Sequence, residues 1–288
     1  MSTFTLAAGR TIEFLDNAVE SDRAIIFHHG TPGSSRTWQP WIAHFADEGI
    51  RVIAASRAGY GQSQRAPGRR VVDISDDITQ MCDSFDISRF VSVGWSGGGP
   101  HALATTLDPR CKGVVTLAGV GQFNQPDLDF LAGMGQENID EFGVALQGEA
   151  ALRDWMNANA AAMARVTGEE IRAAFGGLIG TADKAVLDGP FAAEMAAAMR
   201  WGLAQGFDGW IDDDLAFVRD WGFDLADISV PVVIWQGNDD FMVPHAHSQW
   251  LEQAIPSSEL RLTPGEGHIS LTVKGQNEIV IQLKLMLS

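Results

Sequence analysis

Short runs of consecutive apolar residues recur along the chain, and most of them end near glycine or a polar residue. The runs that we interpret as strands are residues 24–27, 52–55, 90–93, 114–118 and 232–235. Continuous rather than alternating apolar residues are typical of strands that helices cover on both faces. Helical stretches, among them 74–85 and 100–107, separate most of these runs. The pattern therefore predicts an α/β fold with a mostly parallel, doubly wound sheet.

This rhythm of strands and helices stops after Gly121 and resumes near Trp221. Between these positions, residues 150–166, 169–178 and 191–203 are rich in Ala, Met and Leu, which favours helices. Thr167 and Glu170 have the spacing of a capping box, in which the hydroxyl bonds a free amide and the carboxylate reaches back. We expect a helical cap at 122–221, inserted between two parts of the core at 1–121 and 222–288.

The composition is that of an ordinary globular protein, with 45% hydrophobic and 20% charged residues in a chain of 288. Thirty-seven acidic residues against 20 basic ones give a formal charge of −17. Such a charge repels phosphate backbones and anionic lipid headgroups, so neither nucleic acid nor a membrane surface is an expected partner.

Cys82 and Cys111 are the only cysteines, and we expect both to be free thiols. The first residues lack a basic region followed by an apolar stretch, and no run approaches the length of a membrane span. We therefore expect a cytoplasmic protein. The sequence does not indicate an oligomeric state.

A glycine-flanked serine follows one of the predicted strands. Residues 94–98, Gly-Trp-Ser-Gly-Gly, match the pattern G-x-S-x-G between a strand and a helix marked by Pro100. In this setting the serine sits on a strained turn, which requires small residues two positions before and after it. Gly94 and Gly98 meet that requirement, and the following helix N-terminus stabilises negative charge. We predict Ser96 as a nucleophile.

A serine nucleophile needs a base, and the base needs a third group that fixes its tautomer. Two loops follow late strands: 237–244, which contains Asp239 and Asp240, and 264–268, which ends in His268. The carboxyl ends of parallel strands meet at one edge of the sheet, so these residues can converge on Ser96. The order Ser, Asp, His fits this type of fold. We predict His268 as the base; either aspartate satisfies this argument.

An acyl-transfer site also needs two amide donors for the developing oxyanion. The residue after the nucleophile, Gly97, supplies one donor, and the loop 29–33 supplies the other. Within that loop Pro32 has no N–H, which leaves Thr31. His29 is expected to brace the loop rather than to transfer protons.

The remaining histidines are interpreted as structural: His28, His44, His101, His245 and His247. His245 and His247 lack a third ligand at metal-site spacing, so we predict no metal ion. No cofactor is required by the predicted chemistry.

These residues together resemble the α/β-hydrolase superfamily, in particular its capped branch of carboxylesterases, proline iminopeptidases and cofactor-free haloperoxidases or perhydrolases. The similarity covers nearly the whole chain and includes the turn 57–63, although Ser56 and Ala58 stand where relatives often have Asp and Pro. The resemblance implies that Asp240, three residues after Gly237, is the acid of the triad. Epoxide hydrolases and haloalkane dehalogenases of the superfamily use an aspartate nucleophile, so Ser96 argues against both activities.

The resemblance also implies that the cap sets substrate size. Aromatic residues interpreted as lining an apolar pocket are Trp38, Trp95, Phe123 and Trp210. The first expected function is hydrolysis of a small to medium carboxylic ester through an acyl-enzyme. One alternative is cleavage of an amide or an N-terminal peptide bond, with Glu137, Asp140 or Glu141 binding an ammonium group. Another is a ligand-binding protein without turnover.

Overall fold

In the computed structural model, which describes residues 1–288, one sheet of eight strands runs through the molecule in the order β1-β2-β4-β3-β5-β6-β7-β8. The strands are β1 Ser2–Thr5, β2 Thr11–Asp16, β3 Arg23–His28, β4 Arg51–Ala55, β5 Arg89–Trp95, β6 Cys111–Leu117, β7 Val232–Gly237 and β8 Ser258–Thr263. The pairs β1·β2 and β2·β4 are antiparallel and every other pair is parallel. The predicted α/β fold with a mostly parallel sheet is confirmed.

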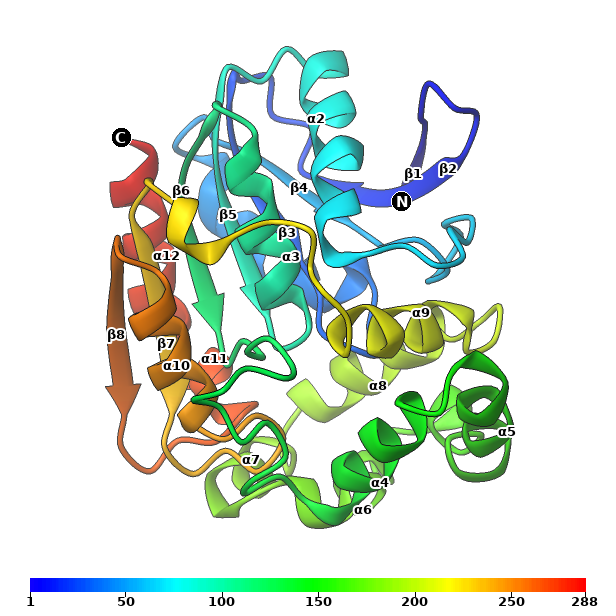
Figure 1. Ribbon diagram of the computed structural model, residues 1–288. Helices are drawn as coiled ribbons and strands as arrows, with labels where there is room; N and C mark the ends of the chain where they lie inside the picture. The colour runs from blue at the N-terminus through cyan, green and yellow to red at the C-terminus, as the bar shows by residue number, and fades with distance from the viewer.

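Helices flank the sheet on both faces (Figure 1). They are α1 Ala43–Ala46, α2 Ile74–Ser84, α3 Gly98–Ala104, α4 Gln136–Ala145, α5 Glu149–Asn159, α6 Ile171–Ala174, α7 Thr181–Val186, α8 Phe191–Gly202, α9 Asp208–Phe217, α10 Ala246–Ala254, α11 Ser270–Lys274 and α12 Gln276–Leu287. Helices α4 to α9 all fall between β6 and β7 and gather beyond the carboxyl ends of the strands (Figure 1). No helix is both long enough and apolar enough to cross a bilayer.

The two faces of the sheet carry separate apolar cores. Alternate residues of β3 divide between them: Ile26 joins the cluster that contains Ile78 of α2, whereas Ile25 joins the cluster that contains Leu283 of α12. This explains the continuous apolar runs in the sequence, because both faces of each central strand are buried. Cys82 and Cys111 are buried and free, as predicted.

The first two strands were not predicted. β1 is mostly exposed, and β2 contains Glu13, a charged residue inside an otherwise apolar run. Glu13 is fully buried because hydrogen bonds satisfy its carboxylate: Ser56 Oγ and Trp201 Nε1 donate to it over 2.7 and 2.8 Å. A buried charge whose partners lie far along the chain hides the strand from a pattern of hydrophobicity.

Two of the predicted cap helices are shorter than expected. The stretch 150–166 is α-helical only to Asn159, and the stretch 169–178 contains only α6 and a short 3-10 helix. The predicted capping box is half formed: Thr167 N–H donates to Glu170 Oε2 over 3.0 Å as expected. The Thr167 hydroxyl, however, donates to the same oxygen rather than bonding an amide, which corrects that part of the prediction.

Candidate active site

Ser96 occupies the sharp turn between β5 and α3. Its φ of +56° is in the left-handed region, which a residue with a side chain rarely adopts. The backbone packs so closely here that a Cβ on Gly94 would collide with the carbonyl of Gly98, and one on Gly98 with the carbonyl of His28. Both flanking glycines are thus required by the geometry, and the turn projects Ser96 beyond the carboxyl end of the sheet.

His268 and Asp240 form a buried hydrogen-bonded pair at the ends of β8 and β7. His268 Nδ1 lies 2.8 Å from Asp240 Oδ2, and the other carboxylate oxygen accepts N–H bonds from Met242 and Val243 over 2.9 and 2.8 Å. Burial works to lower the pKa of His268, but the charge and hydrogen bond of Asp240 outweigh it and raise that pKa above its ordinary value. With Nδ1–H donating to Asp240, Nε2 is the ring nitrogen left to accept a proton.

The neighbouring Asp239 lies elsewhere. Its carboxylate is against Gly180, at the start of α7, and makes no hydrogen bond to His268. Of the two aspartates considered from the sequence, Asp240 is the one beside the histidine.

Ser96 and His268 line one small cavity of about 50 Å³, together with Gly30, Thr31 and Trp95. Ser96, Thr31 and Gly97 also line a larger cavity of about 370 Å³ that is bounded by helices α4, α5, α6 and α9. No hydrogen bond joins Ser96 to His268 in this structure; in sites without substrate such bonds are often long and shorten in the complex. Ser96 therefore lies between His268 and the larger cavity.

The backbone N–H groups of Thr31 and Gly97 donate no hydrogen bond within the protein. The Thr31 loop is held from behind by His29, whose Nε2 accepts the N–H of Arg57 over 3.0 Å while its Nδ1 contacts the carbonyl of Gly30 over 2.7 Å. Burial and the Arg57 charge hold the pKa of His29 well below its usual range. His29 thus stays neutral and braces the loop, as expected from the sequence.

Asp213, on α9, was missed by the sequence analysis. It is fully buried and accepts hydrogen bonds from Arg57, Arg69, Tyr60 and Thr31 over 2.6, 2.6, 2.8 and 2.6 Å. Burial alone would raise the pKa of Asp213, but the two arginine charges hold it well below its usual range. This ionised carboxylate ties the Thr31 loop to the helices inserted between β6 and β7.

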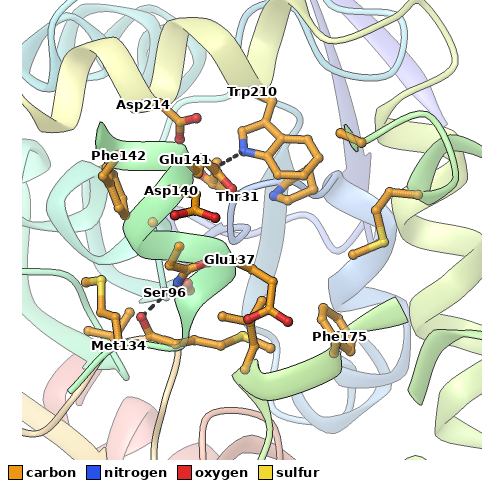
Figure 2. A pocket seen from close by; sticks show the side chains of 18 of the residues that line it. Thr31, Ser96, Met134, Glu137, Asp140, Glu141, Phe142, Phe175, Trp210 and Asp214 are labelled. Atoms are coloured by element: carbon orange, nitrogen blue, oxygen red, sulfur yellow. Dashed lines mark hydrogen bonds between the residues drawn. The ribbon is translucent and has the colours of Figure 1, made fainter. Parts of the chain in front are cut away.

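Four carboxyl groups face the larger cavity, and no lysine, arginine or histidine lines it. Glu137, Asp140 and Glu141 come from α4 and Asp214 comes from α9 (Figure 2). Trp210 Nε1 donates to Glu141 over 2.6 Å. Burial raises the pKa of Glu141, and burial together with the Glu141 charge raises that of Asp214 well above its usual range.

The aromatic residues predicted to bind substrate divide into two groups. Trp95 lines the small cavity, with its ring centroid 5.4 Å from that of His268, and Trp210 lines the larger one. Trp38 instead packs in the core, 4.5 Å from Phe27 between ring centroids, and Phe123 packs on Phe130 at 5.2 Å. Neither Trp38 nor Phe123 reaches a cavity that contains Ser96, which corrects the prediction for both.

His247, interpreted from the sequence as structural, has both ring nitrogens engaged within the protein. Its Nδ1 accepts the N–H of Gly121 over 3.0 Å and its Nε2 contacts the carbonyl of Phe130 over 2.9 Å. The ring therefore links the start of the inserted segment to α10.

Comparison with known proteins gives the family of the chain. A family model described as the alpha/beta hydrolase fold matches residues 23–174. A putative non-heme chloroperoxidase from Synechocystis is 24% identical over 269 residues, covering 90% of this chain and 89% of that protein. A non-heme chloroperoxidase from Streptomyces lividans is 29% identical over 150 residues, and this match spans 51% of the chain and only 54% of the relative.

Among solved structures, an esterase from Exiguobacterium antarcticum superposes with a TM-score of 0.71 at 18% identity, covering 100% of this chain and 99% of the other. At that identity the likeness shows the fold alone.

Proposed function

The chain belongs to the α/β-hydrolase family, and within that family we propose that it hydrolyses small to medium carboxylic esters through an acyl-enzyme on Ser96. One observation carries the proposal: a serine with φ of +56° lines the same cavity as a histidine whose Nδ1 is 2.8 Å from a buried aspartate. No cofactor enters the reaction.

In the first half-reaction, Ser96 Oγ attacks the ester carbonyl carbon while His268 Nε2 takes the hydroxyl proton. The C–O bond to the alcohol then breaks, and His268 returns the proton to the departing alcohol oxygen. In the second half, water attacks the acyl carbon while His268 Nε2 takes a proton from it. The bond between the acyl carbon and Ser96 Oγ then breaks, His268 returns the proton to Ser96 Oγ, and the carboxylic acid leaves. Asp240 keeps the imidazole in the tautomer that presents Nε2 and stabilises its charged form.

The free N–H groups of Thr31 and Gly97 are the proposed oxyanion donors. Gly97 permits the approach of the two loops, because a Cβ at this position would collide with Thr31 Oγ1. The inserted helices, which form the roof of the larger cavity, act as the cap that selects the substrate.

The experiment is turnover of a short p-nitrophenyl ester together with labelling by a fluorophosphonate probe. Ser96→Ala should abolish both turnover and labelling. The control Ser88→Ala, at an exposed serine, should change neither. Asp240→Asn should lower turnover by up to about 10⁴-fold, and its neighbour Asp239→Asn by far less. Labelling that persists in Ser96→Ala would contradict the proposal.

A second candidate function is hydrolysis of an ester or amide whose acyl part carries an amine. The cavity supports it, because four carboxyl groups and no basic side chain line the space above Ser96. An ammonium group in this cavity would donate hydrogen bonds to the carboxyl oxygens of Glu141 and Asp214, which line it.

This candidate is tested by comparing aminoacyl and acetyl p-nitrophenyl esters. Glu141→Gln should lower kcat/KM for the aminoacyl ester by about tenfold or more, as expected for loss of one charged hydrogen bond, and should leave the acetyl ester nearly unchanged. Glu169→Gln, an exposed cap carboxylate outside the cavity, is the matched control. Equal losses on both esters would reject the amine as part of the substrate.

A further inference from the structure

A second buried carboxylate reaches the His268 loop from the inserted helices. Asp183 lies on α7 and is fully buried. Its Oδ2 accepts the backbone N–H of His268 over 3.0 Å, and its Oδ1 accepts those of Ile269 and Ser270 over 2.9 and 2.8 Å. One side chain thus satisfies three consecutive backbone donors 85 or more residues away along the chain.

The loop is shaped to fit this carboxylate. A Cβ on Gly267 would collide with Asp183, so the absence of a side chain there allows the close approach. Asp183 makes no ion pair with Lys, Arg or His. The side-chain carboxylate is bound only by the three backbone N–H groups. Hydrogen bonds from N–H groups to an ionised acceptor are about twice as strong as neutral ones, so this contact fixes the backbone firmly.

We propose that Asp183 is a positioning residue of the Ser96 site: it fixes the backbone of His268 so that the imidazole faces the serine, and its negative charge stabilises the imidazolium. This role rests on the ester-hydrolase function proposed above. Asp240 holds the ring through Nδ1 and Asp183 holds the main chain at the same residue, so the two carboxylates together leave the imidazole little freedom.

The proposed stabilisation of the imidazolium follows from the charges of Asp240 and Asp183 near the ring. Burial acts to lower the pKa of His268, while Asp240 and then Asp183 act to raise it. Removal of the Asp183 charge should therefore lower the pKa of His268. The geometric part has a separate consequence, because a displacement of about 1 Å in a catalytic group can cost about 10²-fold in rate.

Asp183→Asn separates these effects from simple loss of folding. An asparagine offers one oxygen, so its NH₂ group must face at least one of the three N–H groups. We normalise turnover of p-nitrophenyl acetate to the number of sites that a fluorophosphonate labels. On that basis kcat should fall about 10²-fold with little change in KM. The acidic limb of the plot of kcat against pH should move to lower pH. Asp188→Asn, an exposed cap carboxylate paired with Arg172, is the control and should alter neither.

A merely structural role predicts a lower folded fraction with unchanged kcat per labelled site and an unmoved pH limb, and that result would overturn the proposal. Should Asp183→Asn fail to fold, Gly267→Ala perturbs the same contact from the other side and should give the same fall in kcat.

An NMR titration of His268 in the Ser96→Ala protein, with and without Asp183→Asn, needs no turnover. A lower pKa of His268 in the doubly substituted protein supports the role of Asp183, and an unchanged pKa contradicts it. If the wild-type chain hydrolyses no ester, the proposed function fails while this titration still decides the electrostatic effect of Asp183.

Discussion

Asp213 and Asp214 are neighbours on α9 and both are buried, but their pKa values are shifted in opposite directions. Asp213 meets Arg57 and Arg69, and its pKa is held well below the usual range. Asp214 meets no cation; burial and Glu141 raise its pKa well above that range. Successive residues on a helix point about 100° apart, so one faces the core arginines and the other faces the cavity.

The difference teaches that burial alone does not decide the charge of a carboxyl group. Burial acts to raise the pKa of both carboxyl groups, and the charges of their neighbours decide the direction of the net shift. Asp213 is bound to the Thr31 hydroxyl and the two arginines, whereas Asp214, whose pKa is raised, lines the larger cavity. The same residue type is structural in one position and available for recognition in the next.

Asp213→Asn should have the largest effect on stability. It leaves Arg57 and Arg69 buried without a counter-charge, and removal of one partner from a buried ion pair costs about 3–5 kcal/mol. Urea unfolding at pH 7 measures the loss. A loss below about 1 kcal/mol would mean that water or another group satisfies the arginines.

Tyr60→Phe should have an intermediate effect. The Tyr60 hydroxyl donates to Asp213 over 2.8 Å inside the protein, and a hydrogen bond to a charged group contributes about 1.5–3 kcal/mol. The same unfolding measurement applies. In the Asp213→Asn background the effect of Tyr60→Phe should shrink, because its charged acceptor is gone; additive effects would show that the two groups are not coupled.

Asp214→Asn should have the smallest effect near pH 4, and its effect on stability should grow as the pH rises. A carboxyl whose folded pKa is raised contributes stability below its unfolded pKa and loses it as pH rises through the folded value. Near pH 4 the variant and the wild type should be equally stable. At higher pH the wild type should lose about 1.4 kcal/mol for each unit of raised pKa, and the variant should become the more stable protein.

The ionised neighbour should show the reverse dependence. Asp213 has a lowered pKa, so its contribution is present above its unfolded pKa and is lost as pH falls through the folded value. Unfolding series for Asp213→Asn and Asp214→Asn against pH should therefore diverge from the wild type in opposite directions. Parallel series would refute the contrast between the two residues.

The sequence was informative where the candidate site depends on local pattern. Ser96 stands between glycines after an apolar run, and His268 and Asp240 follow late apolar runs, so the strand ends could be located and the three residues brought together. The choice between Asp239 and Asp240 came from the family resemblance, since both residues follow the same strand.

The carboxylates of the inserted helices could not be assigned in this way. Asp183 is satisfied by backbone N–H groups of 268–270, and Asp213 by arginines about 150 residues earlier in the chain. Nothing near either aspartate in the sequence indicates such partners. The available signal was the run Asp212 to Asp214 between Ile211 and Leu215, because three consecutive acids among apolar residues on one helix must be buried in part.

Asp183 and Asp213 also bear on how such a protein can be recombined. Both belong to the segment between β6 and β7, yet they satisfy donors of the sheet domain: the 268–270 amides and the Arg57 and Arg69 guanidinium groups. A chimera that exchanges this whole segment for that of a relative would leave those donors without acceptors, unless the new segment contains equivalent acidic residues. Junctions placed inside the segment, so that α7, α8 and α9 remain with their host, would let α4 to α6 be replaced while these contacts, and that of Trp201 on α8 with Glu13, are kept.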